Sequence, residues 1–229
     1  MAEAWIIDGC RTPRGIGKPG KGALAGIHPQ HLGATVLKAL AERNDLNTSE
    51  VDDIIWGTSS QRGQQGGDLG RMAALDAGYD IKASAVTLDR FCGSGITSVN
   101  IAASSVMSGM EDVVIAGGTE MMSTYGQGGN NSSPFMDSGN ERLRSVHPQP
   151  HQGVCADAIA TLENINREDV DKLAMVSQEN AAKAIKGGFF DKSLIPVYKE
   201  DGSLALDHEE FPRPNTCLLY TSPSPRDFG

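Results

Sequence analysis

Cys92 lies in the stretch between Val86 and Val99, where the pattern of residues points to a reactive group. The residues before it alternate like those of a buried strand, and the apolar residues after it recur at helical steps of three and four. Gly93 and Gly95 supply the small residues that a sharp turn needs. The pattern therefore predicts a strand-to-helix turn, with Cys92 just before or at the first helical residue.

A thiol at the start of a helix is suited to act as a nucleophile. The free N–H groups and the partial positive charge of a helix N-terminus favour thiolate over thiol. An amide of the first turn could also donate to the oxyanion that forms on an attacked carbonyl. A lone cysteine is more often a small buried residue. The strand–Cys–Gly-x-Gly–helix arrangement nevertheless favours a catalytic role for Cys92.

Composition and charge exclude several classes of protein. A formal net charge of −9 argues against a broad nucleic-acid surface. The four cysteines show no CxxC pair, so we expect neither a disulfide framework nor a metal site, and a reducing, cytoplasmic setting. The first residues lack the basic region of a secretory signal, and no apolar stretch has the length of a membrane span. The sequence therefore predicts a soluble protein without a membrane partner.

Strands and helices alternate along the chain up to about residue 120. We expect strands at 4–8, 53–56, before Cys92 and at 112–116, and helices from Pro29, at 70–77 and from Cys92 to Gly109. This alternation is typical of an α/β fold, in which helices cover both faces of a parallel or mixed sheet.

The sequence pattern changes between residues 121 and 150, where apolar residues recur with neither helical nor strand spacing. Two helices are expected after it, the second capped by Asn166. We interpret this region as an insertion or lid over the α/β domain.

Three other sequence patterns indicate a function less specifically than the Cys92 motif does. Residues 15–20 match GxGxxG, but Pro19 postpones the next helix, so we interpret them as a surface loop rather than a nucleotide site. The histidines of 147–151 have a metal-ligand spacing on a helix, but the prolines between them favour a loop that lines a pocket. The Glu209–Glu210 pair is interpreted as a solvated edge.

Several motifs, taken together, resemble the thiolases, which are acyltransferases that act on coenzyme A thioesters. They are Ile-Ile-Asp-Gly-Cys-Arg-Thr-Pro at 6–13, Asp-Arg-Phe-Cys-Gly-Ser-Gly at 89–95, Val-Ile-Ala-Gly-Gly-Thr-Glu-Met-Met at 114–122, Ser-Gln-Glu-Asn-Ala-Ala-Lys-Ala at 177–184 and Phe-Pro-Arg-Pro-Asn-Thr at 211–216. The motifs occur in order, which makes the resemblance far more specific than any one of them alone.

The resemblance implies a role for five residues. Cys92 matches the nucleophile that accepts the acyl group, and His151 matches a histidine beside the pantetheine arm. Leu143 matches a residue at the acyl end, and Arg213 a basic residue near the nucleotide part of coenzyme A. Gln152 stands where many relatives carry methionine. Coenzyme A is implied as co-substrate, with no further cofactor and with a homo-oligomer, a dimer or tetramer, for the full-length parent.

The resemblance also implies a division of the chain. Residues 1–120 match a thiolase-like N-terminal α/β domain, 121–216 a loop domain on the coenzyme A side, and 217–229 a non-native tail. The family's second half, with a Gly-His-Pro histidine, a second cysteine and an asparagine, has no counterpart here. We therefore expect a thiolase by lineage, in fatty acid metabolism, that is truncated and inactive alone.

Three alternatives remain from the sequence. The chain could be a non-catalytic fragment that binds a partner or coenzyme A. A β-ketoacyl synthase shares the nucleophile turn, and a nucleotide-binding enzyme is the most distant alternative.

Overall fold

The computed structural model describes residues 3–124 and 136–213. The chain divides into two compact units, which are described separately. Unit 1 comprises Met1–Gly128 and Phe190–Phe211, and unit 2 comprises Gly129–Phe189 and Pro212–Gly229. This division differs from the expected segments because residues 190–211 return to unit 1. The 217–229 segment, expected to be non-native, lies outside the described residues.

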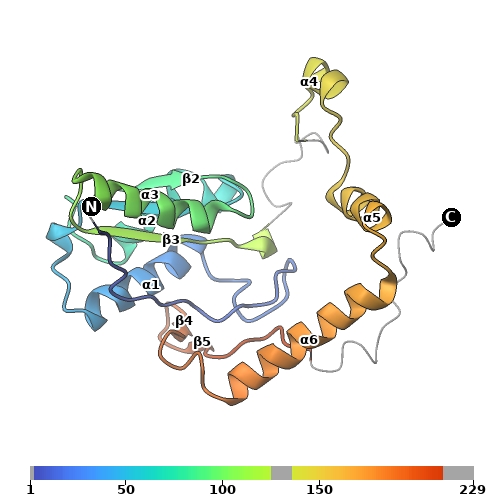
Figure 1. Ribbon diagram of the computed structural model, residues 1–229. Helices are drawn as coiled ribbons and strands as arrows, with labels where there is room; N and C mark the ends of the chain where they lie inside the picture. Colours follow the sequence, from blue (N-terminus) through green and yellow to red (C-terminus); the bar gives the residue numbers. More distant parts are fainter. Residues whose placement is uncertain (1–2, 125–135, 214–229) are drawn as a thin grey trace. The chain divides into compact units, whose positions relative to one another are not determined.

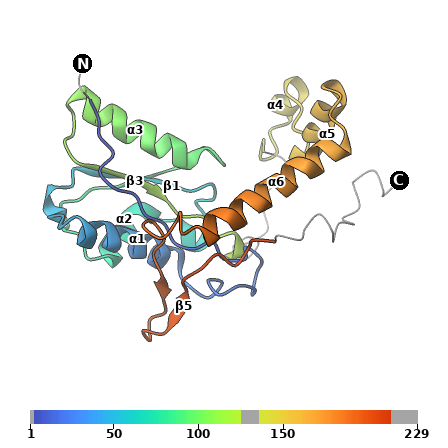
Figure 2. The same ribbon diagram turned by 60° about the horizontal axis from the view of Figure 1, so that its bottom comes forward.

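Unit 1 is built around a three-stranded parallel sheet in the order β2-β1-β3. The strands are β1 (Asp53–Gly57), β2 (Val86–Leu88) and β3 (Val114–Gly118). Helices α1 (Pro29–Arg43) and α2 (Leu69–Asp76) cover one face, and α3 (Ser94–Ser108) covers the other (Figure 2). Short 3-10 helices span Thr48–Glu50, Gly63–Gln65 and Met122–Thr124. The expected α/β fold with helices on both faces is confirmed.

The core of unit 1 explains why these elements form where they do. Pro29 begins α1 with a φ that is preset for a helix, and the His28 side chain accepts from the Gln30 backbone N–H. Leu37 of this helix and Ile54 of β1 are both fully buried and belong to one hydrophobic cluster. The apolar residues whose spacing predicts α1 and β1 are thus residues that face the core.

The strand expected at residues 4–8 does not form. Trp5, Ile6 and Ile7 lie in irregular backbone and are 78%, 85% and 82% exposed. Apolar and β-branched residues favour a strand only where a neighbouring strand accepts them. This segment makes such a pairing only farther along, where Arg11 bridges Leu194 in parallel.

The Glu209–Glu210 pair is not a solvated edge, contrary to the expectation. The Glu209 side chain is only 3% exposed and forms ion pairs with Arg11 and Arg14. The Glu210 carboxylate accepts from the backbone N–H groups of Ile16 and Ala23, each at 3.0 Å. Carboxylates that follow the hairpin β4 (Val197–Tyr198) and β5 (Leu204–Leu206) therefore hold the glycine-rich N-terminal loop.

Unit 2 contains α4 (Glu141–Val146), α5 (Gln152–Leu162) and α6 (Arg167–Lys186) (Figure 1). The two later helices confirm the prediction, whereas α4 was missed. Asn140 caps α4, and Arg144 forms two hydrogen bonds to Asp137, at 2.6 and 2.7 Å. Both contacts are local, and they explain how a helix as short as α4 is held. Across the described residues no helix combines the length and apolarity needed to cross a membrane.

Candidate functional site

Cys92 lies in the turn that connects β2 to α3. Gly93 is the N-cap of α3, and Ser94 is its first helical residue. The thiol-bearing residue therefore stands two positions before the helix, as the spacing predicts. Its side chain is exposed, so a reagent can reach the sulfur.

The backbone of this turn is constrained. Phe91 has a φ of 48°, a left-handed conformation that costs a non-glycine residue roughly 1–2 kcal/mol. Its N–H donates to Asp89 Oδ1 at 2.7 Å, and its carbonyl accepts from the Ser94 hydroxyl at 2.6 Å. These contacts maintain the unusual conformation of the residue next to Cys92.

The turn belongs to the carboxyl edge of the sheet. The Thr58 N–H donates to the Leu88 carbonyl, and the Thr119 N–H donates to the Gly57 carbonyl, both at 3.0 Å. A Cβ at Gly57 would lie 2.9 Å from the carbonyl carbon of Ser94, so this approach requires glycine. Three parallel strands thus end at one edge, where α/β folds commonly place their sites.

A polar network that the sequence did not predict occupies the same edge. Glu120 accepts from the Ser59 N–H at 2.6 Å and from Gln65 Nε2 at 3.1 Å. Gln65 is 1% exposed, and its side chain also donates to the Ser60 carbonyl at 3.0 Å. From the sequence, the only indication that Glu120 could belong to a site is its position directly after the strand that forms β3. The network fixes the loops that follow β1 and β3.

The other described cysteines lie in different surroundings. Burial raises the pKa of the Cys10 thiol, and the charge of Arg43 only partly opposes this effect. Cys10 Sγ donates to the Val36 carbonyl at 3.5 Å. Cys155 is of intermediate exposure, with its sulfur 3.9 Å from the Pro150 carbonyl oxygen. Cys92 is thus the exposed thiol among the described cysteines.

The four residues expected to contact coenzyme A lie in unit 2, whereas Cys92 lies in unit 1. His151 is the N-cap of α5, with Nδ1 accepting from the Gly153 N–H at 3.1 Å, and Gln152 is the first residue of that helix. Leu143 is 38% exposed on α4. The Arg213 N–H donates to Gln178 Oε1 at 2.8 Å, which ties this residue to α6.

The histidines of the 147–151 stretch do not share a helix. Residues 148–150 have no regular structure, as the prolines predict. No group of three or more His, Cys, Asp or Glu side chains suited to a metal occurs among residues 3–124 and 136–213.

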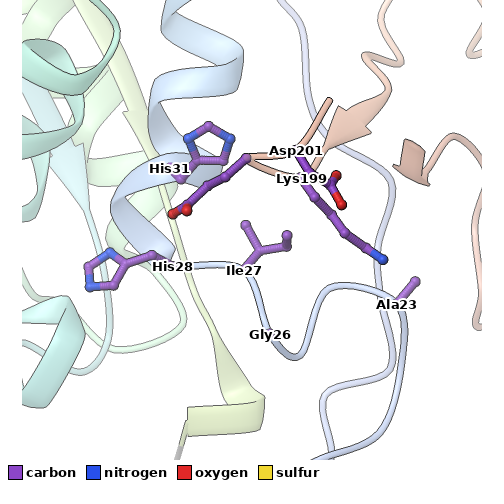
Figure 3. A pocket seen from close by; sticks show the side chains of 8 residues that line it. Ala23, Gly26, Ile27, His28, His31, Lys199 and Asp201 are labelled. Carbon is purple, nitrogen blue, oxygen red and sulfur yellow. The ribbon is translucent and has the colours of Figure 1, made fainter. Parts of the chain in front are cut away.

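A cavity of about 380 Å³ lies elsewhere in unit 1, lined in part by residues from the start of α1 and from the β4–β5 turn. Figure 3 shows His28 and His31 on one side, with Lys199 and Asp201 on the other. His28 caps α1, and His31 Nδ1 lies 3.3 Å from Asp76 Oδ2, so both imidazoles already have structural contacts. The nucleophile turn contributes no residue to this cavity.

Several known proteins are similar to this chain in sequence. Residues 4–219 match the family described as thiolase, N-terminal domain. A steroid 3-ketoacyl-CoA thiolase of Mycobacterium tuberculosis is 37% identical over 90% of this chain and 52% of its own length. A 3-ketoacyl-CoA thiolase of Bacillus subtilis is 35% identical, covering 91% of this chain and 52% of that protein.

A solved structure agrees with the sequence matches. The crystal structure of the Bacillus anthracis acetyl-CoA acetyltransferase superposes with a TM-score of 0.77 at 29% identity, covering 96% of this chain and 57% of that one. The chain therefore spans about half the length of the curated relatives described above. On these matches and on its fold, the chain belongs to the thiolase family and corresponds to the N-terminal domain of that family.

Proposed function

We propose that this chain carries the nucleophile of an acyltransferase that acts on coenzyme A thioesters. The thiolate of Cys92 attacks the thioester carbonyl, the bond from carbon to the coenzyme A sulfur breaks, and coenzyme A leaves as its thiol after taking up a proton. In condensation the acyl group then passes to the carbanion that a second acetyl-CoA forms by losing a proton from C2. In thiolysis the thiolate instead attacks the 3-oxo carbon of a 3-ketoacyl-CoA, the C2–C3 bond breaks, and acetyl-CoA leaves after its C2 takes up a proton. The thiol of coenzyme A then attacks the acyl-cysteine, takes the acyl group and releases the Cys92 thiol. The observation that carries this proposal is the exposed Cys92 on a constrained turn before α3.

The residues of unit 2 would bind the co-substrate in this proposal. His151 would lie beside the pantetheine arm, with Gln152 next to it, Leu143 at the acyl end and Arg213 near the nucleotide. The position of His151 and Gln152 at the start of α5 supports this assignment, because a helix N-terminus suits polar and anionic groups. No cofactor other than coenzyme A is required.

The whole reaction needs more than these residues. A free cysteine is only a few per cent thiolate near pH 7, so an adjacent base provides much of its reactivity. Loss of a general acid or base typically slows a reaction by about 10²–10⁴-fold. Because the chain spans about half the length of its relatives, we propose that it does not turn over alone. From the resemblance to thiolases we further propose that the full-length parent is a cytoplasmic homo-oligomer.

Acylation of the thiol and turnover can be measured separately. The chain is incubated with acetyl-CoA, and its peptides are analysed by mass spectrometry for one acetyl group on Cys92. A Cys92→Ser variant is the control, with Cys10→Ser as the matched variant that keeps the label. Equal acetylation of Cys10, or acetylation that persists without Cys92, would contradict the proposal. Thiolysis of acetoacetyl-CoA by the isolated chain would show that it is not an inactive fragment.

A further inference from the structure

The Ser94 hydroxyl is buried directly beneath the nucleophile turn. Ser94 is 4% exposed, and its Oγ accepts from the Arg90 N–H at 2.9 Å. The same Oγ lies 2.6 Å from the Phe91 carbonyl oxygen and 3.4 Å from that of Thr58, to which it can donate. One side chain therefore contacts the two residues that precede Cys92 and the residue that follows β1.

These contacts act on backbone that would not hold this shape unaided. Phe91 has a φ of 48°, which non-glycine residues adopt only when their surroundings enforce it. Its support on the exposed side is Asp89, whose Oδ1 accepts from the Phe91 N–H at 2.7 Å. On the buried side, Gly57 brings the backbone of β1 against Ser94 so closely that a Cβ would lie 2.9 Å from the Ser94 carbonyl oxygen. Ser94 is thus fixed from behind while it binds the turn.

We propose that Ser94 is a positioning residue for Cys92. Its hydroxyl joins the backbone of Arg90 to that of Phe91 and thereby holds the thiol before the amino end of α3. Without the hydroxyl, the turn is free to relax toward ordinary φ values, and the thiol spends less time near the first amides of the helix. This inference rests on the proposed nucleophilic role of Cys92.

The same helix provides a matched control in Ser98. Ser98 is 0% exposed, and its hydroxyl donates to the Gly95 carbonyl at 2.7 Å or to the Gly117 carbonyl at 3.1 Å. Ser98 lies one helical turn after Ser94 and anchors α3 to β3. Among the described residues, its hydroxyl makes no hydrogen bond to the turn that precedes Cys92. Ser94→Ala and Ser98→Ala therefore each remove a buried hydroxyl, but only the first removes contacts to the turn.

The test measures the rate at which iodoacetamide alkylates Cys92 at neutral pH in the full chain, together with the melting temperature. We expect both alanine variants to melt at a lower temperature. We expect Ser94→Ala alone to slow alkylation on the order of tenfold, because the thiol then lies less often at the helix N-terminus, which favours the reactive thiolate. Ser94→Thr keeps the hydroxyl and should restore the rate. Equal alkylation rates in Ser94→Ala and Ser98→Ala, or a Ser94→Thr rate as low as that of Ser94→Ala, would overturn the proposal.

A second variant keeps the test decisive if Ser94→Ala does not fold. Asp89→Ala removes the exposed support of Phe91 and leaves Ser94 in place. If Ser94 is the main support of the turn, alkylation of Cys92 in this variant falls by much less than tenfold, and a tenfold loss would show that Asp89 holds the turn instead. Because alkylation needs no acyl-CoA, failure of acetyl transfer to Cys92 would count against the proposed function without deciding the role of Ser94.

Discussion

Trp56 Nε1 donates a hydrogen bond of 3.1 Å to the hydroxyl of Thr119. Trp56 is 1% exposed in β1, and Thr119 directly follows β3. A buried indole N–H needs such a partner, since leaving it unpaired would cost about 1–3 kcal/mol. The bond links two neighbouring strands at the edge where the Cys92 turn also lies, so the indole supports the edge that carries the candidate nucleophile.

The ring of Trp56 fits only because glycine faces it. A Cβ at Gly117 would lie 2.4 Å from Cζ3 of the indole, too close for any real contact. We therefore expect Gly117→Ala to lower the free energy of unfolding by about 1–3 kcal/mol, as overpacking of a core does. Urea unfolding, followed by tryptophan fluorescence, measures the change.

Gly95→Ala is the matched control for this prediction. Gly95 is within α3, and apart from its chain neighbours and the nearby helix backbone, no atom of the described residues lies within 4 Å of a Cβ at this position. Alanine there should leave stability unchanged or raise it by up to about 1 kcal/mol. Equal destabilisation by the two substitutions would show that the contact with the indole is not the cause.

Cys92 should react with iodoacetamide before Cys10 does. The thiol of Cys92 is exposed, whereas burial raises the pKa of Cys10 and so keeps its thiolate scarce at neutral pH. We expect peptide mass spectrometry at increasing times to find the Cys92 label first. In a Cys92→Ser chain the fast phase should disappear, while a Cys10→Ser chain should keep it. Labelling of both at one rate would contradict the exposure difference.

The elements around Cys92 could be predicted because their signals are local. Helix α1 begins at a proline, and α3 ends at Ser108, just before its C-cap Gly109. Gly109 has a left-handed φ of 75°, so residue type and conformation agree. The capping box of Asn166 and Asp169 likewise starts α6 where the sequence places it. Residue spacing alone does not identify the family, whereas the resemblance of the motifs to thiolases does. The match to the thiolase N-terminal domain favours thiolase over the β-ketoacyl synthase alternative.

What could not be predicted depends on distant partners. The expected strand at 4–8 does not form, because composition alone does not show whether a neighbouring strand is present to pair with it. The burial of Glu209 follows from Arg11 and Arg14, almost two hundred residues earlier in the chain. Gln65 gave no signal at all, since only the fold brings it to Glu120.

Glu209 should make unit 1 sensitive to acid. Desolvation raises the pKa of Glu209, but hydrogen bonds from the Arg14 backbone and from the Arg11 and Arg14 side chains outweigh it and hold the pKa below the ordinary value of 4.5. A carboxyl whose pKa is lower in the folded state stabilises that state above pH 4.5 and loses this effect as the pH falls below it. We expect Glu209→Gln to cost about 1–3 kcal/mol at pH 7.

The difference between Glu209→Gln and the unmodified chain should shrink as the pH falls below 4.5, and it should vanish below the lowered folded-state pKa of Glu209, where its carboxyl is neutral like the amide. Urea unfolding at a series of pH values, followed by tryptophan fluorescence, measures it. Glu42→Gln is the control, since Glu42 is an exposed partner of Lys38 at 3.9 Å and such pairs contribute about 0–1 kcal/mol. A constant difference at all pH values would refute the ionic origin.

The stability of helix α6 should depend on its N-cap more than the stability of helices that pack into a core does. None of its residues is buried, so local contacts account for a larger share of its stability. The Asn166 side chain accepts from the Asp169 N–H at 3.0 Å, and the Asp169 carboxylate accepts from the Asn166 N–H at 3.2 Å. Asn166→Ala removes half of this reciprocal pair, and such changes cost about 1 kcal/mol.

Hydrogen exchange of the peptide covering the first turn of α6 measures this cost directly. A loss of about 1 kcal/mol corresponds to roughly fivefold faster exchange of the amides that the cap protects. Asn166→Asp keeps an oxygen acceptor at the same position and adds a negative charge near the helix N-terminus, so it should preserve or improve protection. If alanine and aspartate accelerate exchange equally, the side-chain acceptor is not what starts the helix at Arg167.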